Sequence, residues 1–94
     1  MGGYRRDIAN KILKDGYGVE LSPLHRDADC EFWEYVRVLP NGEKAVCVMS
    51  FEVGLAAYPP NMLKRICEEL GLGSEFDAIR RKIIDLGGWV GRRP

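Results

Sequence analysis

Residues 32–53 read FWEYVRVLPNGEKAVCVMSFEV and predict a β-hairpin. Its two flanks are rich in aromatic and β-branched residues, and Pro40-Asn41-Gly42-Glu43 stands between them. An Asn-Gly step forms a tight turn between antiparallel strands because both residues tolerate a positive φ. The period of two places apolar side chains on both faces of the first strand, with Trp33 and Tyr35 on one face and Phe32, Val36 and Val38 on the other.

Upstream of the hairpin, the pattern predicts a helix followed by a strand. Tyr4, Ile8 and Ile12 recur at helical spacing, which predicts a helix over residues 4–14 that the Asp15-Gly16 step ends. Residues 17–22 then alternate as a half-buried strand, and Pro23 either ends this strand or places it at a sheet edge. Residues 25–31 are polar and predict a solvated loop.

Downstream of the hairpin, two helices are expected. Pro59-Pro60-Asn61 introduces the first, Gly71 closes it, and Leu72 can fold back on its last turn in a Schellman motif. Ser74, with Asp77 three residues later, gives a capping signal for a helix over residues 74–87. Residues 89–94 form a tail. The chain is therefore expected to be one α+β domain, residues 1–94, with a three-stranded antiparallel sheet and its helices packed on one face.

Size and charge limit the possible functions. With 94 residues, the chain has room for one small core. Lys and Arg number 14, as do Asp and Glu, so the formal net charge is zero and long-range attraction to nucleic acid is not a property of the whole molecule. The basic side chains are unevenly distributed, with an excess in residues 61–94. Any surface for RNA must therefore be local.

Cysteine usage and hydropathy predict a cytoplasmic protein. Cys30, Cys47 and Cys67 are odd in number and widely spaced, which favours a reducing compartment, and Cys47 and Cys67 lie in apolar patterns typical of a core. No apolar run is long enough to span a bilayer, and the first residues lead into a polar helix instead of a signal sequence. Neither a cofactor nor a membrane partner is expected.

Two stretches carry a resemblance to a known family. A helix ending in Ile12-Leu13-Lys14-Asp15-Gly16-Tyr17, three strands, and a helix that reads PPNMLKRICEELGL over residues 59–72 resemble the layout of HicA toxins, also called YcfA-like proteins. The resemblance covers the unit of residues 4–72 and leaves the helix over 74–87 as an addition. It implies a double-stranded-RNA-binding-like fold, metal-independent cleavage of mRNA by a histidine, and neutralisation by a HicB antitoxin.

His25 is the only histidine and the expected catalytic residue. It follows Ser22-Pro23-Leu24, where the family usually has Gly-Ser before its histidine. Imidazole can take a proton from a ribose 2′-hydroxyl or give one to the leaving oxygen near neutral pH. Asp27, Asp29 or Tyr35 would have to handle the second proton. The alternative is a solvated histidine with no catalytic role.

Basic side chains on the helices and beside the histidine are the expected RNA contacts. They are Arg5, Arg6, Lys11, Lys14, Arg26, Lys64 and Arg65. The alternative is that they form the solvated faces of amphipathic helices. Potential metal ligands also gather in the loop, namely His25, Asp27, Asp29, Cys30 and Glu31, but their spacing matches no established motif and a polar turn is the expected structure.

Two functions from different classes follow from these patterns. The first is a HicA-like protein that acts on RNA, with a HicB-like antitoxin or another protein as partner. The second is a non-catalytic module, such as a phage or mobile-element inhibitor, that binds a protein or a nucleic acid. In either case Trp33 and Tyr35 could stack bases or dock a partner, or the additional C-terminal helix could cover them or form a homodimer contact.

Overall fold

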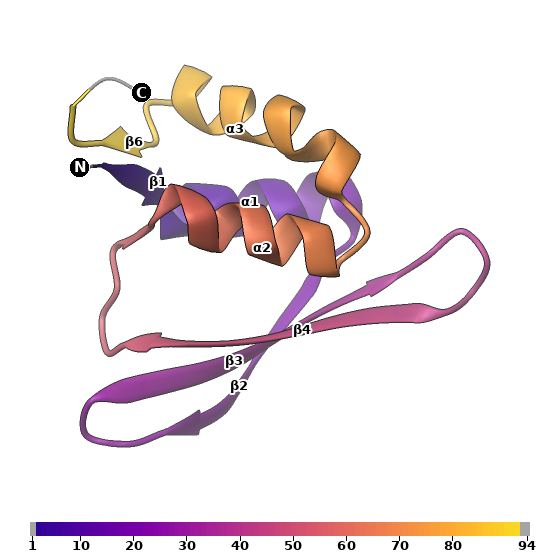
Figure 1. Cartoon of the computed structure of the whole chain (residues 1–94), viewed down its shortest axis with the longest axis horizontal. Helices are drawn as coiled ribbons and strands as arrows, with labels where there is room; N and C mark the ends of the chain where they lie inside the picture. Colours follow the sequence, from indigo (N-terminus) through magenta and orange to yellow (C-terminus); the bar gives the residue numbers. More distant parts are fainter. Residues whose placement is uncertain (1, 93–94) are drawn as a thin grey trace.

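The computed structural model describes residues 2–92 and contains three helices and two antiparallel sheets (Figure 1). The larger sheet has the order β2-β3-β4, and the smaller has the order β5-β1-β6. The elements are β1 Gly3–Arg5, α1 Arg6–Tyr17, β2 Glu20–Arg26, β3 Cys30–Val38, β4 Lys44–Glu52, β5 Ala57–Tyr58, α2 Pro60–Glu69, α3 Phe76–Asp85 and β6 Trp89–Val90. The α+β class predicted from the sequence is confirmed.

The hairpin formed by β3 and β4 is the longest pairing in the structure and has the predicted turn. Its register is regular, with Tyr35 opposite Cys47 and Val38 opposite Lys44. Gly42 has a φ of 88°, as expected for the glycine of an Asn-Gly turn. Because side chains alternate along each strand, one face of the hairpin points to the helices and the other points away from them.

β2 forms one edge of the larger sheet and runs past Pro23. The prediction that the strand covers 17–22 and that residues 25–31 form a loop is wrong, because His25 and Arg26 belong to β2 and Glu31 to β3. Proline is tolerated here because an edge strand has no neighbouring strand on one side, so the missing N–H breaks no hydrogen bond of the sheet on that side. The register shifts between Pro23 and His25, which is the irregularity that accommodates it.

The first helix begins and ends later than the sequence predicts. Tyr4 lies in β1, and α1 continues through Gly16 to Tyr17. Gly18 takes the left-handed conformation, with a φ of 68°, and the N–H of Val19 donates to the carbonyl of Leu13. The predicted stop at Asp15-Gly16 is therefore wrong by two residues, although a glycine in the left-handed conformation does end the helix.

The second helix ends as predicted. Gly71 has a φ of 72°, the N–H of Leu72 donates to Cys67 over 2.7 Å, and the N–H of Gly71 donates to Glu68 over 3.1 Å. These two bonds define a Schellman motif. The buried side of α2 consists of Leu63, Ile66 and Cys67.

The C-terminal segment differs most from expectation. Ser74 lies in a short 3₁₀ turn, Gly73–Glu75, and neither this turn nor α3 has a side-chain capping bond, so the predicted cap from Ser74 to Asp77 is wrong. The predicted tail contains β6, which pairs with β1 and places Trp89 opposite Tyr4. Arg93 and Pro94 lie outside the described residues.

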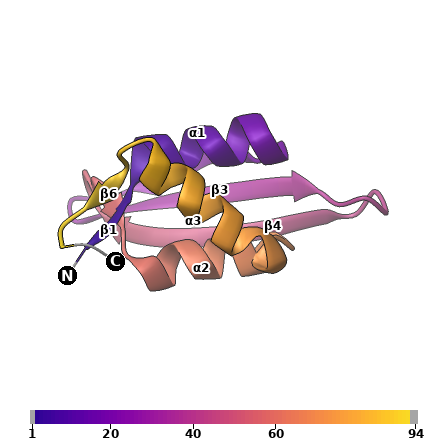
Figure 2. The same cartoon turned by 90° about the horizontal axis from the view of Figure 1, so that it is seen from above.

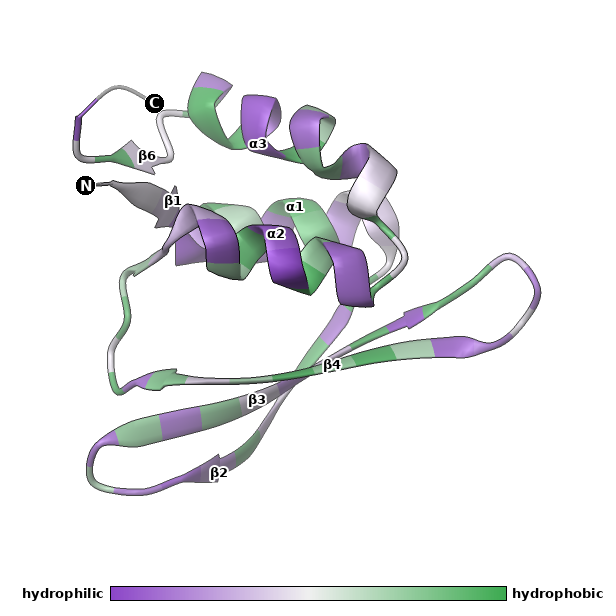
Figure 3. Ribbon diagram, viewed as in Figure 1, coloured by the Kyte–Doolittle hydropathy of each residue, from purple (hydrophilic) through white to green (hydrophobic). Residues whose placement is uncertain are grey.

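One core joins these parts in three layers. α1 and α2 cover one face of the larger sheet, and α3 lies over these two helices (Figures 1 and 2). Each helix has buried apolar residues, and Figure 3 shows hydrophobic and hydrophilic residues alternating along the helices. Ile79 and Ile83 of α3 are as fully buried as Leu13 of α1 and Leu63 of α2. The hypothesis that α3 covers Trp33 and Tyr35 is wrong, because α3 packs on the helices and not on the sheet.

The length and hydropathy of the helices can also be compared with those of membrane-spanning helices. No helix between residues 2 and 92 combines the length and the apolar character that crossing a membrane requires.

Because α3 contributes to the same core as the rest of the chain, a cavity in it should destabilise the whole domain. We expect Ile83→Ala to lower the free energy of unfolding by about 2–5 kcal/mol, since Ile83 is fully buried. Leu86→Ala, one turn later and 66% exposed, should change it by less than about 0.5 kcal/mol. Urea unfolding followed by circular dichroism measures both, and equal losses would contradict this packing.

Candidate functional site

His25 lies near the end of β2, with its ring on the sheet face that no helix covers. It is exposed and stands opposite Phe32 of β3. The two ring centroids are 5.7 Å apart, with the planes tilted by 38°. The aromatic neighbour limits the orientations of the imidazole while solvent reaches its free edge. The imidazole of His25 is thus accessible from solvent on the open face of the sheet.

The turn that follows His25 is organised by Asp27. One carboxylate oxygen of Asp27 accepts the N–H of Asp29 over 2.9 Å and the N–H of Cys30 over 2.7 Å. These backbone donors, together with a smaller contribution from His25, hold the pKa of Asp27 below its usual range. Asp27 is therefore an ionised turn residue and not a proton donor at neutral pH.

Tyr35 cannot supply the second proton to a reaction at His25. Its side chain is fully buried on the opposite face of the sheet. Its hydroxyl lies 2.7 Å from that of Tyr58, which donates to the side-chain oxygen of Asn10 over 2.6 Å. Because the Tyr58 proton is used in that bond, Tyr35 must donate to Tyr58. Burial raises the pKa of both tyrosines.

A depression of about 280 Å³ lies beside His25 at the end of the sheet. It is lined by Pro23, Leu24, His25, Arg26, Glu31 and Trp33. Arg26 is exposed and stands opposite Glu31 in the strand register. His25 and Arg26 are consecutive in β2, so their side chains leave this edge on opposite faces, His25 beside Phe32 and Arg26 beside Glu31.

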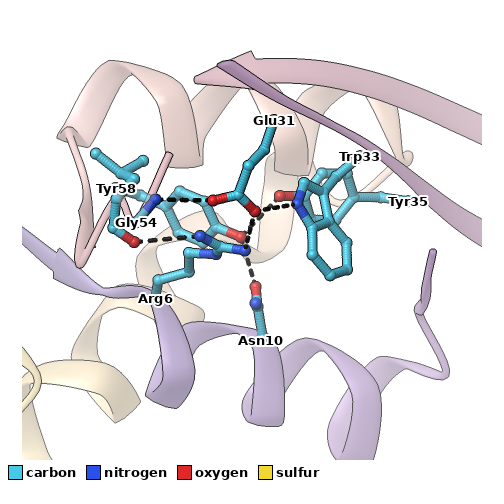
Figure 4. A network of polar contacts seen from close by, with 8 residues as sticks. Arg6, Asn10, Glu31, Trp33, Tyr35, Gly54 and Tyr58 are labelled. Carbon is cyan, nitrogen blue, oxygen red and sulfur yellow. Dashed lines mark hydrogen bonds and ion pairs between the residues drawn. The ribbon is translucent and has the colours of Figure 1, made fainter. Parts of the chain in front are cut away.

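Glu31, which lines this depression, accepts hydrogen bonds from several donors. It accepts the N–H of Gly54 over 2.8 Å and the indole N–H of Trp33 over 2.9 Å, and it lies 3.5 Å from the guanidinium of Arg6 (Figure 4). The hydrogen bond from Gly54 first, and then that from Trp33, lowers the pKa of Glu31. Glu31 is therefore an ionised anchor for the start of β3.

Arg6 has an internal role in place of the expected contact with RNA. Its side chain is 17% exposed, and its guanidinium carbon lies 5.2 Å from the centroid of the Trp33 ring and 4.6 Å from that of Phe51. It also donates to the carbonyl oxygen of Leu55 over 3.2 Å. With Glu31 as its ionic partner, Arg6 joins the start of α1 to β3 and to the turn after β4 (Figure 4).

Three of the other six predicted RNA contacts have acidic partners. Arg5 pairs with Asp7, Lys11 with Asp15, and Arg65 with Glu69, at 2.7–2.8 Å. Within residues 2–92, no carboxylate oxygen lies within 4.0 Å of the side-chain nitrogens of Lys14, Arg26 or Lys64. The structure therefore does not bring the seven basic residues together as one patch.

The potential metal ligands near the histidine are also separated. In the part of the chain that the structure describes, no three His, Cys, Asp or Glu side chains gather as a metal site would require. Glu31 is engaged by Arg6, Trp33 and Gly54, while His25 lies on the other face of the sheet.

Comparisons of this chain with family models, with curated proteins and with solved structures find no match.

The sequence analysis missed the Arg6–Glu31–Trp33 contacts and the Tyr35–Tyr58–Asn10 chain of hydrogen bonds. The sequence does show that Glu31, Trp33 and Tyr35 alternate along one strand and therefore share a face. This alternation places the Glu31 carboxylate on the same face as side chains of the core. A charge in that position requires a partner.

The Tyr58 hydroxyl should contribute measurably to stability because it satisfies two buried groups. Tyr58→Phe leaves the Tyr35 hydroxyl and the Asn10 oxygen without this partner, so we expect a loss of about 1–3 kcal/mol in the free energy of unfolding. Tyr17→Phe is the control, because the Tyr17 hydroxyl has no hydrogen bond among the described residues. Similar unfolding midpoints in urea for wild type and Tyr58→Phe would contradict the hydrogen-bonding scheme.

Proposed function

We propose that the chain is a HicA-like protein that cleaves RNA without a metal, with His25 as the proton-transfer residue. The observation that carries the proposal is the exposed imidazole of His25, packed against Phe32 at the rim of a surface depression at the end of the sheet. The order α1-β2-β3-β4-α2, with both helices on one face of an antiparallel sheet, supports it because a double-stranded-RNA-binding-like domain has this layout.

The reaction would be an attack of the ribose 2′-oxygen on the adjacent phosphorus. Neutral His25 takes the proton of the 2′-hydroxyl as the new O–P bond forms, and the bond from phosphorus to the 5′-oxygen breaks. The products are a 2′,3′-cyclic phosphate and a 5′-hydroxyl, whose proton comes from water. Arg26, exposed at the same edge of the sheet, binds phosphate oxygens of the strand.

The RNA strand would follow the edge of the sheet along β2. A second depression, of about 540 Å³, is lined by Lys14 and residues 18–22, so Lys14 and Arg26 lie toward the two ends of this edge. Both are exposed cations without a close carboxylate among residues 2–92. Phosphate contacts of this kind position a strand without reading its sequence.

The second candidate is a non-catalytic binding module. Three of the expected RNA contacts are neutralised by neighbouring carboxylates, and Arg6 lies inside the fold. This observation favours a function that does not depend on a strongly basic surface.

An RNA cleavage assay with His25→Ala distinguishes the two candidates. Purified wild-type protein in the presence of a chelator should cleave RNA to products with 2′,3′-cyclic phosphate ends, and His25→Ala should lower the rate by about 100-fold or more, since it removes the general base. Arg65→Ala, which removes a cation already paired with Glu69 on α2, is the matched control and should leave the rate unchanged. Cleavage that survives the loss of His25 would contradict its catalytic role, and a wild-type protein that never cleaves RNA would support the binding module.

A further inference from the structure

The sheet face opposite the helices carries four neighbouring valines, Val36, Val38, Val46 and Val48, here called the valine patch. Val36 stands opposite Val46 in the register of β3 and β4. Val38, Val46 and Val48 are 60%, 47% and 49% exposed. All three helices lie on the other side of the sheet (Figure 1). Solvent-exposed apolar side chains gathered on adjacent strands are typical of a surface that a partner covers.

Acidic side chains border the valine patch. Glu34 stands between Ser22 and Val48 across the sheet, and Glu20 stands opposite Val36. Among the described residues, neither carboxylate has a cation within 4.0 Å. Lys44 lies at the hairpin end of the face, opposite Val38. The face is thus an apolar surface with a negative border along its β2 side.

This charge distribution selects among possible occupants. A phosphate backbone lying across this face would meet the carboxylate of Glu34 beside Val48, which disfavours RNA here. A second copy packed face to face would place four carboxylates, two of Glu20 and two of Glu34, in one interface with two Lys44 ammonium groups, and this excess of negative charge disfavours a homodimer through this face. A protein segment with apolar side chains for the valines and Lys or Arg for the glutamates has neither conflict.

We propose that the valine patch and Glu34 form a docking surface for a basic, apolar protein segment. The surface is separate from the proposed RNA path, because the valines lie toward the hairpin turn while His25 stands opposite Phe32, toward the other end of β3. The proposal does not depend on RNA cleavage, and variants of the patch leave His25 and Arg26 unchanged.

The test uses two synthetic peptides that differ only in charge, one alternating arginine with valine and the other alternating glutamate with valine. Fluorescence anisotropy measures their binding to the full chain, and amide chemical shifts locate it. We expect the arginine peptide alone to bind, with shifts confined to β3 and β4 residues of the open face. A Val46→Thr/Val48→Thr double variant should weaken binding at least tenfold, because threonine keeps the branched shape but presents a hydroxyl. Glu34→Gln should also weaken it, and Val90→Thr, an exposed valine of β6, is the control.

Several results would overturn the proposal. These are equal binding of both peptides, binding that the double threonine variant does not weaken, shifts on α1 or α2 in place of the sheet, or no binding by either peptide. A loss of RNA binding in the double threonine variant would assign the face to nucleic acid instead. The RNA cleavage assay is read separately, so failure of this surface and failure of His25 catalysis give different patterns.

Discussion

The guanidinium of Arg6 is the contact on which the arrangement of helix and sheet depends. Arg6 is the first residue of α1, and its charge lies between the rings of Trp33 and Phe51 with Glu31 as its partner. A largely buried charge is costly unless it is paired and hydrogen-bonded, and here the carboxylate, the two rings and the carbonyl of Leu55 meet that requirement. The same contacts hold the start of β3 and the turn after β4 against α1, at the end of the sheet that carries His25.

Features set by nearby residues were predictable from the sequence. The β3–β4 turn follows from Asn41-Gly42, and the end of α2 follows from Gly71. The end of α1 was misplaced because two glycines compete, and the helix continues through Gly16 to Gly18, where Lys11 and Asp15 can pair one turn apart. Strands as short as β1, β5 and β6 show no periodicity, and their pairing joins the two ends of the chain, so no local pattern could predict them.

The candidate site shows the same division. His25 was predicted as a site residue from its chemistry, and Arg26 and Asp27 follow it directly in the sequence. The internal role of Arg6 was not predictable, because its partners Glu31, Trp33 and Leu55 are distant in the sequence and its amphipathic helix presents it like any other surface cation. Among the described residues, five basic side chains form ion pairs within the fold: Arg5, Arg6, Lys11, Arg65 and Arg80. The surfaces that remain are the β2 edge, with Lys14 and Arg26, and the open sheet face, with its valines and Glu34.

The unfolding free energies of wild type, Arg6→Met, Glu31→Gln and the double variant test this account most directly. Methionine keeps an apolar side chain between the two rings, so the cycle isolates the charge. The account predicts that the double variant loses less stability than the sum of the single variants at neutral pH. Because the donors around Glu31 hold its pKa below the usual range, the coupling should be present at neutral pH and disappear as the pH falls through that lowered pKa. Additive losses at neutral pH, or a coupling that persists in acid, would contradict the central role of Arg6.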